Sequence, residues 1–87
     1  MHEASLMTGL MKKIEALAAA EGASRVVGVS VRLGALSHMS AEHFLEHFAQ
    51  ASAGTLAEDA RLDVSVSEDT QDPCAQDIVL ESVEVET

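Results

Sequence analysis

The segment RVVGVSVRL, residues 25–33, constrains the fold more than any other part of the chain. Its apolar residues alternate with small or polar ones, and this period of two is typical of a β-strand that buries one face. The expected buried set is Val27, Val29, Val31 and Leu33, and the opposite set is Gly28, Ser30 and Arg32. A strand with one apolar face needs a covering layer, so other elements are expected to pack on it.

A first amphipathic helix is predicted from Ala4 to Glu21, where apolar residues recur at spacings of three and four. Gly22 stands where such a helix would end. The expected buried stripe is Leu6, Met7, Leu10, Met11, Ile14, Leu17 and Ala18.

A second helix is predicted at about residues 41–52. Ser40 precedes it and can cap it, because a serine hydroxyl accepts hydrogen bonds from free backbone amides. Met39 and Phe44 are spaced as a hydrophobic staple around this cap, and Gly54 follows the helix. The expected buried stripe is Phe44, Leu45, Phe48 and Ala49.

Two more strands follow. The first contains Leu62, Val64 and Val66 in alternation with polar residues, and the second is IVLESVEVE, which has one phase slip near Ser82. The polar loop DTQDPCAQ, residues 69–76, is short enough to close these strands into an antiparallel hairpin. Some 28 residues with a helix separate the first two strands, enough for a right-handed crossover between parallel neighbours.

The order α-β-α-β-β predicts an α+β domain of two layers, with both helices on one face of a three-stranded mixed sheet. The chain has 87 residues, and a chain of this length has too little surface to bury for a second core. We therefore expect a single domain, residues 1–87. The only aromatic residues are Phe44 and Phe48, so its core must be mainly aliphatic.

Charge and composition narrow the possible partners and compartments. The net charge is −10, and residues 55–87 hold ten acidic residues against Arg61 alone, so nucleic acid is a poor partner. No run approaches the ~20 apolar residues that span a bilayer, and the N-terminus has the wrong charge order for a secretory signal. The single cysteine, Cys74, gives no reason to expect an oxidising compartment. The cytoplasm is the expected location.

His2 is the most informative candidate ligand. The terminal amine, the His2 backbone amide and the His2 ring can close two adjacent chelate rings in one plane, an arrangement that favours nickel or copper in the divalent state. A fourth position would stay open for another ligand or for transfer of the ion. The alternative is that His2 is simply part of a frayed terminus.

Other candidate sites are weaker. His43 and His47 are four residues apart on the second predicted helix, and HFLEH imitates the H-x-x-E-H signature of certain zinc peptidases. The sequence offers no clear third ligand or substrate cleft, so an enzyme is not expected. The two histidines either face solvent or form an auxiliary metal contact with His38. Cys74 has no cysteine partner and no basic neighbour in sequence, which favours an inert thiol.

Four motifs occur in a particular order: MHEASLM, VRLGALSHMSAEHF, GTLAEDARLDV and SVEVE. In this order they resemble the HypA/HybF family of hydrogenase nickel-insertion accessory proteins, over residues 1–68 and again over about 77–86. The resemblance implies nickel(II) binding by Met1, His2 and Glu3. It also implies non-enzymatic delivery of nickel to the large subunit of nickel-iron hydrogenases, and often to urease, together with a GTPase accessory protein, HypB.

The chain departs from that family in two places. Members insert a zinc ribbon with paired C-x-x-C motifs between the last two strands, whereas the loop here is residues 69–76 with Cys74 alone, so no structural zinc is expected. Some relatives also carry an aspartate near the nickel where this chain has Ser40, a poorer metal ligand. His38 or Glu42 could compensate.

The departures leave a second interpretation open. A degenerate relative could keep the fold but act as a protein-interaction or regulatory module, docking through its acidic C-terminal part or an exposed strand edge. The oligomeric state is open on the same grounds, because a three-stranded sheet has free edges.

Overall fold

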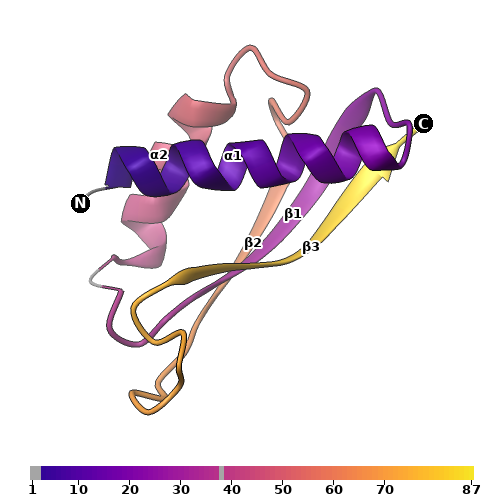
Figure 1. Cartoon of the computed structure of the whole chain (residues 1–87). Coiled ribbons are helices and arrows are strands. Elements are labelled where there is room, and N and C mark those ends of the chain that lie inside the picture. Colours follow the sequence, from indigo (N-terminus) through magenta and orange to yellow (C-terminus); the bar gives the residue numbers. More distant parts are fainter. Residues whose placement is uncertain (1–2, 38) are drawn as a thin grey trace.

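The computed structural model describes residues 3–37 and 39–87, and its elements follow the predicted order (Figure 1). The two helices are α1, Glu3–Ala20, and α2, Ala41–Ser52. The three strands are β1, Arg25–Leu33, β2, Arg61–Val66, and β3, Ile78–Glu86, and they form one mixed sheet. The predicted α+β fold with the order α-β-α-β-β is confirmed.

The strand order is β2-β1-β3, with β1 in the centre. β1 runs parallel to β2, as the crossover predicted, and antiparallel to β3. The expected hairpin between β2 and β3 is therefore wrong, because β3 lies on the opposite edge of β1. This order places the strand with the most deeply buried side chains in the centre of the sheet, where both of its edges are hydrogen-bonded to neighbouring strands.

The chain reaches the far edge by passing the end of β1. The Ser67 amide donates to the Leu33 carbonyl at 2.9 Å, and the Gly34 amide donates to the Asp77 carbonyl at 2.9 Å. A Cβ atom on Gly34 would overlap the Ala75 carbonyl oxygen and lie 2.6 Å from that of Cys74. A glycine at this position thus lets residues 67–77 cross in direct contact with the strand end.

Two β-bulges change which side chains face the core. A register shift between Val26 and Gly28 buries Val26 completely and leaves Val27 37% exposed, so the prediction that Val27 belongs to the buried face is wrong. The second shift pairs Ser30 with Ser82 and Val31 with Leu80, which leaves Glu81 as the extra residue. This bulge confirms the phase slip predicted near Ser82.

One face of the sheet carries the core and the other carries charge. The outer face holds ion pairs from Arg32 to Glu81 and from Arg61 to Glu84, and the second pair crosses over Gly28. Both helices contribute to the core on the opposite face, whose buried members include Met7, Leu10, Met11, Ile14, Ala18, Val26, Val29, Val31, Leu33, Met39, Phe44, Phe48 and Ala57.

Three of the predicted helix ends are confirmed. Gly22 has φ +66°, and the hydrogen bonds from Ala23 N to Ala18 O and from Gly22 N to Ala19 O form a Schellman motif. Ser40 is the N-cap of α2, where its hydroxyl accepts from the His43 amide at 3.1 Å. Gly54, just beyond the other end of α2, has φ +78°.

The buried stripes are narrower than predicted. Leu6 and Leu17 of α1 are 40% and 47% exposed, and Leu45 of α2 is 44% exposed. Ala49 is exposed as well, whereas Ser52, which the predicted stripe did not include, is buried. Only the central rows of each helix can reach a sheet of three strands, so residues at the margins of a stripe stay outside.

Neither helix of the described chain combines the length and the apolar character that a membrane span needs.

Candidate metal centre

Of the three predicted N-terminal ligands, only Glu3 is among the described residues. Met1 and His2 are outside the described residues, and Glu3 is the first residue of α1. A few residues further along, Met7 and Leu10 are 4% and 5% exposed in the core. A metal ligand set at this terminus would therefore be continuous with a helix that is anchored to the sheet.

The residues proposed to compensate for a missing aspartate are only partly described. Ser40 has a structural task, because its hydroxyl oxygen accepts the His43 amide hydrogen bond. Glu42 is exposed in the first turn of α2. His38 lies outside the described residues.

His43 and His47 are brought together on one side of α2. Their Nε2 atoms are 2.8 Å apart, their ring centroids are 4.6 Å apart, and the rings are tilted by 38°. His43 is exposed and His47 is half-buried. Among the described residues no group of three or more His, Cys, Asp or Glu side chains is arranged to hold a metal. The pair is thus a two-ligand set, and that part of the chain does not complete the site of a zinc peptidase.

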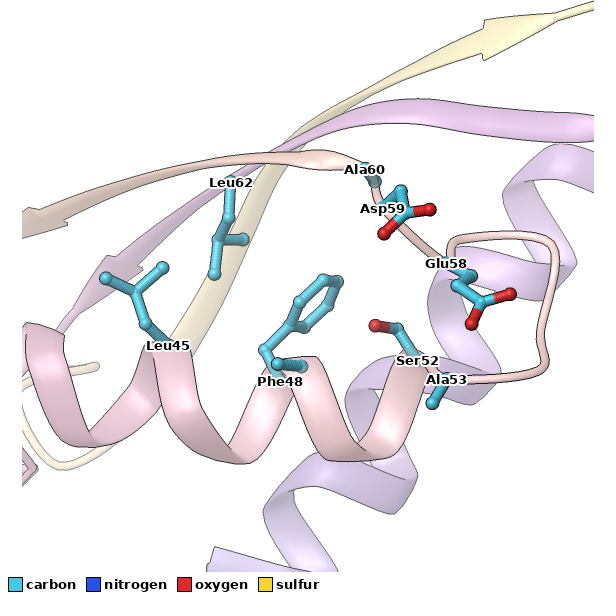
Figure 2. Close-up of a pocket in the computed structure, with 9 residues that line it drawn as sticks. Leu45, Phe48, Ser52, Ala53, Glu58, Asp59, Ala60 and Leu62 are labelled. Atoms are coloured by element: carbon cyan, nitrogen blue, oxygen red, sulfur yellow. The ribbon is translucent and has the colours of Figure 1, made fainter.

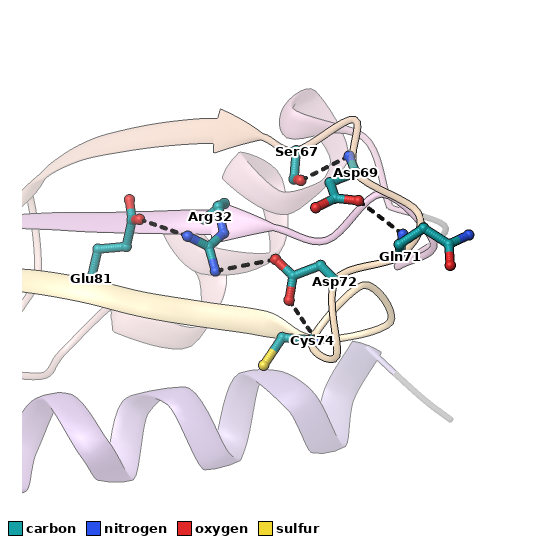
Figure 3. Close-up of polar contacts among 7 residues, drawn as sticks. All are labelled: Arg32, Ser67, Asp69, Gln71, Asp72, Cys74 and Glu81. Atoms are coloured by element: carbon teal, nitrogen blue, oxygen red, sulfur yellow. Dashed lines mark hydrogen bonds and ion pairs between the residues drawn. The ribbon is translucent and has the colours of Figure 1, made fainter.

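Cys74 lies in an ordered short loop rather than in a thiolate cluster (Figure 3). Its amide donates to Asp72 Oδ1 at 2.8 Å, and Asp72 Oδ2 lies 3.9 Å from Arg32 Nη2. Arg32 Nη1 also donates to Glu81 Oε2 at 3.3 Å. The arginine on β1 therefore holds the crossing loop and the β3 bulge to the same strand.

Acidic residues of the C-terminal half are partly paired on the sheet. Arg32 and Arg61 together contact four carboxylates, which belong to Asp63, Asp72, Glu81 and Glu84. These pairs are solvent-exposed or half-exposed, so each contributes little stability. The excess negative charge of this half therefore rests on the acidic residues outside these ion pairs.

A hollow that the sequence did not indicate lies between α2 and the start of β2 (Figure 2). It has a volume of about 280 Å³, with apolar walls formed by Leu45, Phe48 and Leu62 and two carboxylates from Glu58 and Asp59. The exposed position of Leu45 is explained by this hollow. Its lining contains no histidine, cysteine, lysine or arginine, so it offers neither a nucleophile with a base nor a mixed metal-ligand set.

The structure is a small two-layer α+β domain whose helix α2 carries a pair of adjacent histidines. The family model described as "Hydrogenase/urease nickel incorporation, metallochaperone, hypA" matches residues 1–84. The chain therefore belongs to the HypA family, which confirms the resemblance seen in the sequence. The family consists of metallochaperones and maturation factors rather than enzymes.

Curated relatives agree with this assignment. The hydrogenase maturation factor HypA of Roseiflexus sp. (strain RS-1) is 44% identical over 64 residues, which are 74% of this chain and 52% of the relative. That of Chlorobium limicola is 38% identical over 64 residues, 74% of this chain and 55% of the relative. That of Archaeoglobus fulgidus is 36% identical over 66 residues, 76% of this chain and 60% of the relative. The chain spans little more than half the length of the curated relatives it matches.

Solved structures show the same fold. The solution structure of the Ni metallochaperone HypA from Helicobacter pylori aligns with a TM-score of 0.79 at 20% identity, covering 98% of this chain and 97% of that one. A second solution structure of a HypA protein aligns with a TM-score of 0.75 at 21% identity, covering 99% and 97%. At these identities the likeness establishes the architecture.

Proposed function

We propose that this chain is a nickel metallochaperone domain that binds nickel(II) through Met1, His2 and Glu3 and passes it on for the maturation of a nickel-iron hydrogenase or of urease. The observation that carries the proposal is the match of the family model from residue 1 to residue 84, which includes the M-H-E terminus. This terminus also has the atoms of a planar nitrogen chelate.

The chemistry of such a site suits a carrier. Nitrogen ligands in a plane favour tetragonal nickel(II), and an open fourth position allows an incoming ligand to take the ion. Glu3 is the first residue of α1. Because α1 packs into the core through Met7, Leu10 and Ile14, the chelate would be presented at the end of a fixed element.

The proposed partners are a GTPase of the HypB type and the hydrogenase large subunit, in the cytoplasm. The acidic C-terminal half favours basic protein surfaces over nucleic acid. In this proposal the loop at residues 69–76 takes the place of the zinc ribbon, so nickel is bound without a structural zinc ion.

The test is a calorimetric nickel titration of the chain with its native N-terminus, of His2→Ala and of a form with one residue added before Met1. We expect one equivalent of tight binding in the native form and its loss in the other two, because each change removes one chelating nitrogen or its geometry. Equal tight binding by all three forms would refute the N-terminal site.

A second candidate function is that of a protein-interaction module without metal delivery. It is favoured by a wide hollow of about 850 Å³ between α1 and β3, whose walls include Leu6, Leu17, Ile78 and Leu80. Leu6 and Leu17 are among the most exposed large apolar residues of the described chain. If the native form binds no nickel, this function becomes the preferred one.

A further inference from the structure

We propose that His43 and His47 form a second metal site, separate from the N-terminal chelate, which binds a divalent nickel or copper ion through two cis imidazole nitrogens. Its two ligands lie on α2, and they are other residues than Met1, His2 and Glu3. The two ligands are the first and last residues of the segment HFLEH, residues 43–47.

The distance between the two nitrogens is compatible with chelation of one ion. Ring nitrogens bind such ions at about 2.0–2.1 Å, so two of them at about 90° are about 2.9 Å apart, whereas two tetrahedral ligands are about 3.3 Å apart. The observed Nε2 to Nε2 separation is 2.8 Å. This separation is that of the hydrogen bond between the rings, so it shows that the two side chains can bring both nitrogens within chelating distance. Small rotations about the side-chain torsions then turn both lone pairs toward cis positions of a divalent nickel or copper ion, both of which prefer tetragonal geometry.

The helix holds the pair in register. Phe44 and Phe48 directly follow the two histidines and are 0% and 3% exposed, with ring centroids 6.2 Å apart. The Ser40 hydroxyl fixes the first turn at the His43 amide. The backbone beneath both ligands is thus anchored in the core, and binding has to order only the two imidazole side chains.

The hydrogen bond between the two rings can be exchanged for bonds to an ion. Two neutral imidazoles at 2.8 Å share one N–H, which one ring donates and the other accepts. An ion bound by both Nε2 lone pairs requires the donating ring to change its tautomer, so its proton moves from Nε2 to Nδ1 through solvent and both imidazoles stay neutral. His43 is exposed, and His47 borders an open hollow between the helices, so water or a group from a partner can occupy the remaining coordination positions.

The test uses the full chain with His2→Ala and His38→Gln, which leaves His43 and His47 as its only histidines. Titration with nickel(II) chloride is expected to show one equivalent of weak binding, and adding His47→Gln is expected to lower the affinity at least tenfold. Circular dichroism of each variant checks the fold.

The matched control keeps the number of histidines but changes their spacing. His47→Gln with Gln50→His places the two rings seven residues apart, about 10.5 Å along the helix axis, too far for one ion. This control is expected to lose binding, and also to lose the rise in thermal unfolding temperature that nickel gives the parent by binding the folded state.

Each result decides the matter. If the spacing control binds as well as its parent, or if the parent binds no nickel, the pair is not a chelate and the proposal is wrong. The N-terminal site is measured separately with His43→Gln and His47→Gln beside a native His2. Tight nickel binding by that variant, together with no binding by the chain with His2→Ala and His38→Gln, would reject the site at His43 and His47 and keep the proposed function.

Discussion

At the scale of the residue, two glycines decide how the chain closes around its central strand. Gly28 leaves room on β1 for the ion pair of Arg61 and Glu84, which passes above it. Gly34 lets the loop backbone at Cys74 and Ala75 touch the strand end. The two contacts differ in kind, because side chains can rotate away from a new methyl group and a backbone carbonyl cannot.

Gly34→Ala is therefore expected to lower the free energy of unfolding by about 1–3 kcal/mol, the usual cost of overpacking. Urea unfolding followed by circular dichroism measures it. Gly9→Ala is the matched control, because Gly9 lies within α1 and a Cβ there meets no atom within 4 Å. That control is expected to stabilise the chain by about 0.5–1 kcal/mol. Equal effects of both substitutions would contradict the role assigned to Gly34.

At the scale of the element, α2 depends on its N-cap and its aromatic ridge. Its 12 residues are too few for a stable isolated helix. Phe44 and Phe48 bind it to the core, and Ser40 satisfies a free amide at its first turn. The same element carries His43 and His47, so the end of the helix and the histidine pair are physically connected.

Ser40→Ala is expected to lower stability by about 1 kcal/mol through loss of the cap, whereas Ser40→Asp is expected to keep it, since aspartate caps as well as serine. Thermal unfolding of the three forms makes the comparison. If Ser40→Asp proves as unstable as Ser40→Ala, the hydrogen bond to the His43 amide is not what the position contributes.

At the scale of the whole molecule, one core joins both helices to the sheet. Ile14 is completely buried where α1 covers the strands, and Leu17, one turn further, is 47% exposed. The core contains few aromatic rings, so its stability depends on many aliphatic contacts. A cavity at its centre should weaken the whole domain at once rather than loosen one helix.

Ile14→Ala is expected to cost about 2–5 kcal/mol, and Leu17→Ala under about 1 kcal/mol. Chemical denaturation monitored both by circular dichroism and by proteolysis resistance tests the difference. Similar losses for the two variants, or separate transitions for the two probes, would argue against a single cooperative core.

Local signals predicted much of this protein because their causes are local. The cap at Ser40, the stop at Gly22 and the span of β1 depend on hydrogen bonds and periodicity within a few residues, and each was predicted correctly. The spacing of His43 and His47 likewise predicted that both rings lie on the same side of α2. The M-H-E terminus was found by motif, and its binding role stays a prediction because Met1 and His2 lie outside the described residues.

By itself, then, the sequence determined the elements, their order and the family, since periodicity, capping chemistry and motif order are written along the chain. The tertiary structure decided which strand lies in the centre, because β3 could pair with either neighbour until the loop crossed at Gly34. It also decided that Val26 rather than Val27 is buried, because a bulge arises only when two strands are paired. Finally, it set the 2.8 Å between the Nε2 atoms of His43 and His47, a distance that depends on side-chain rotamers and not on spacing alone.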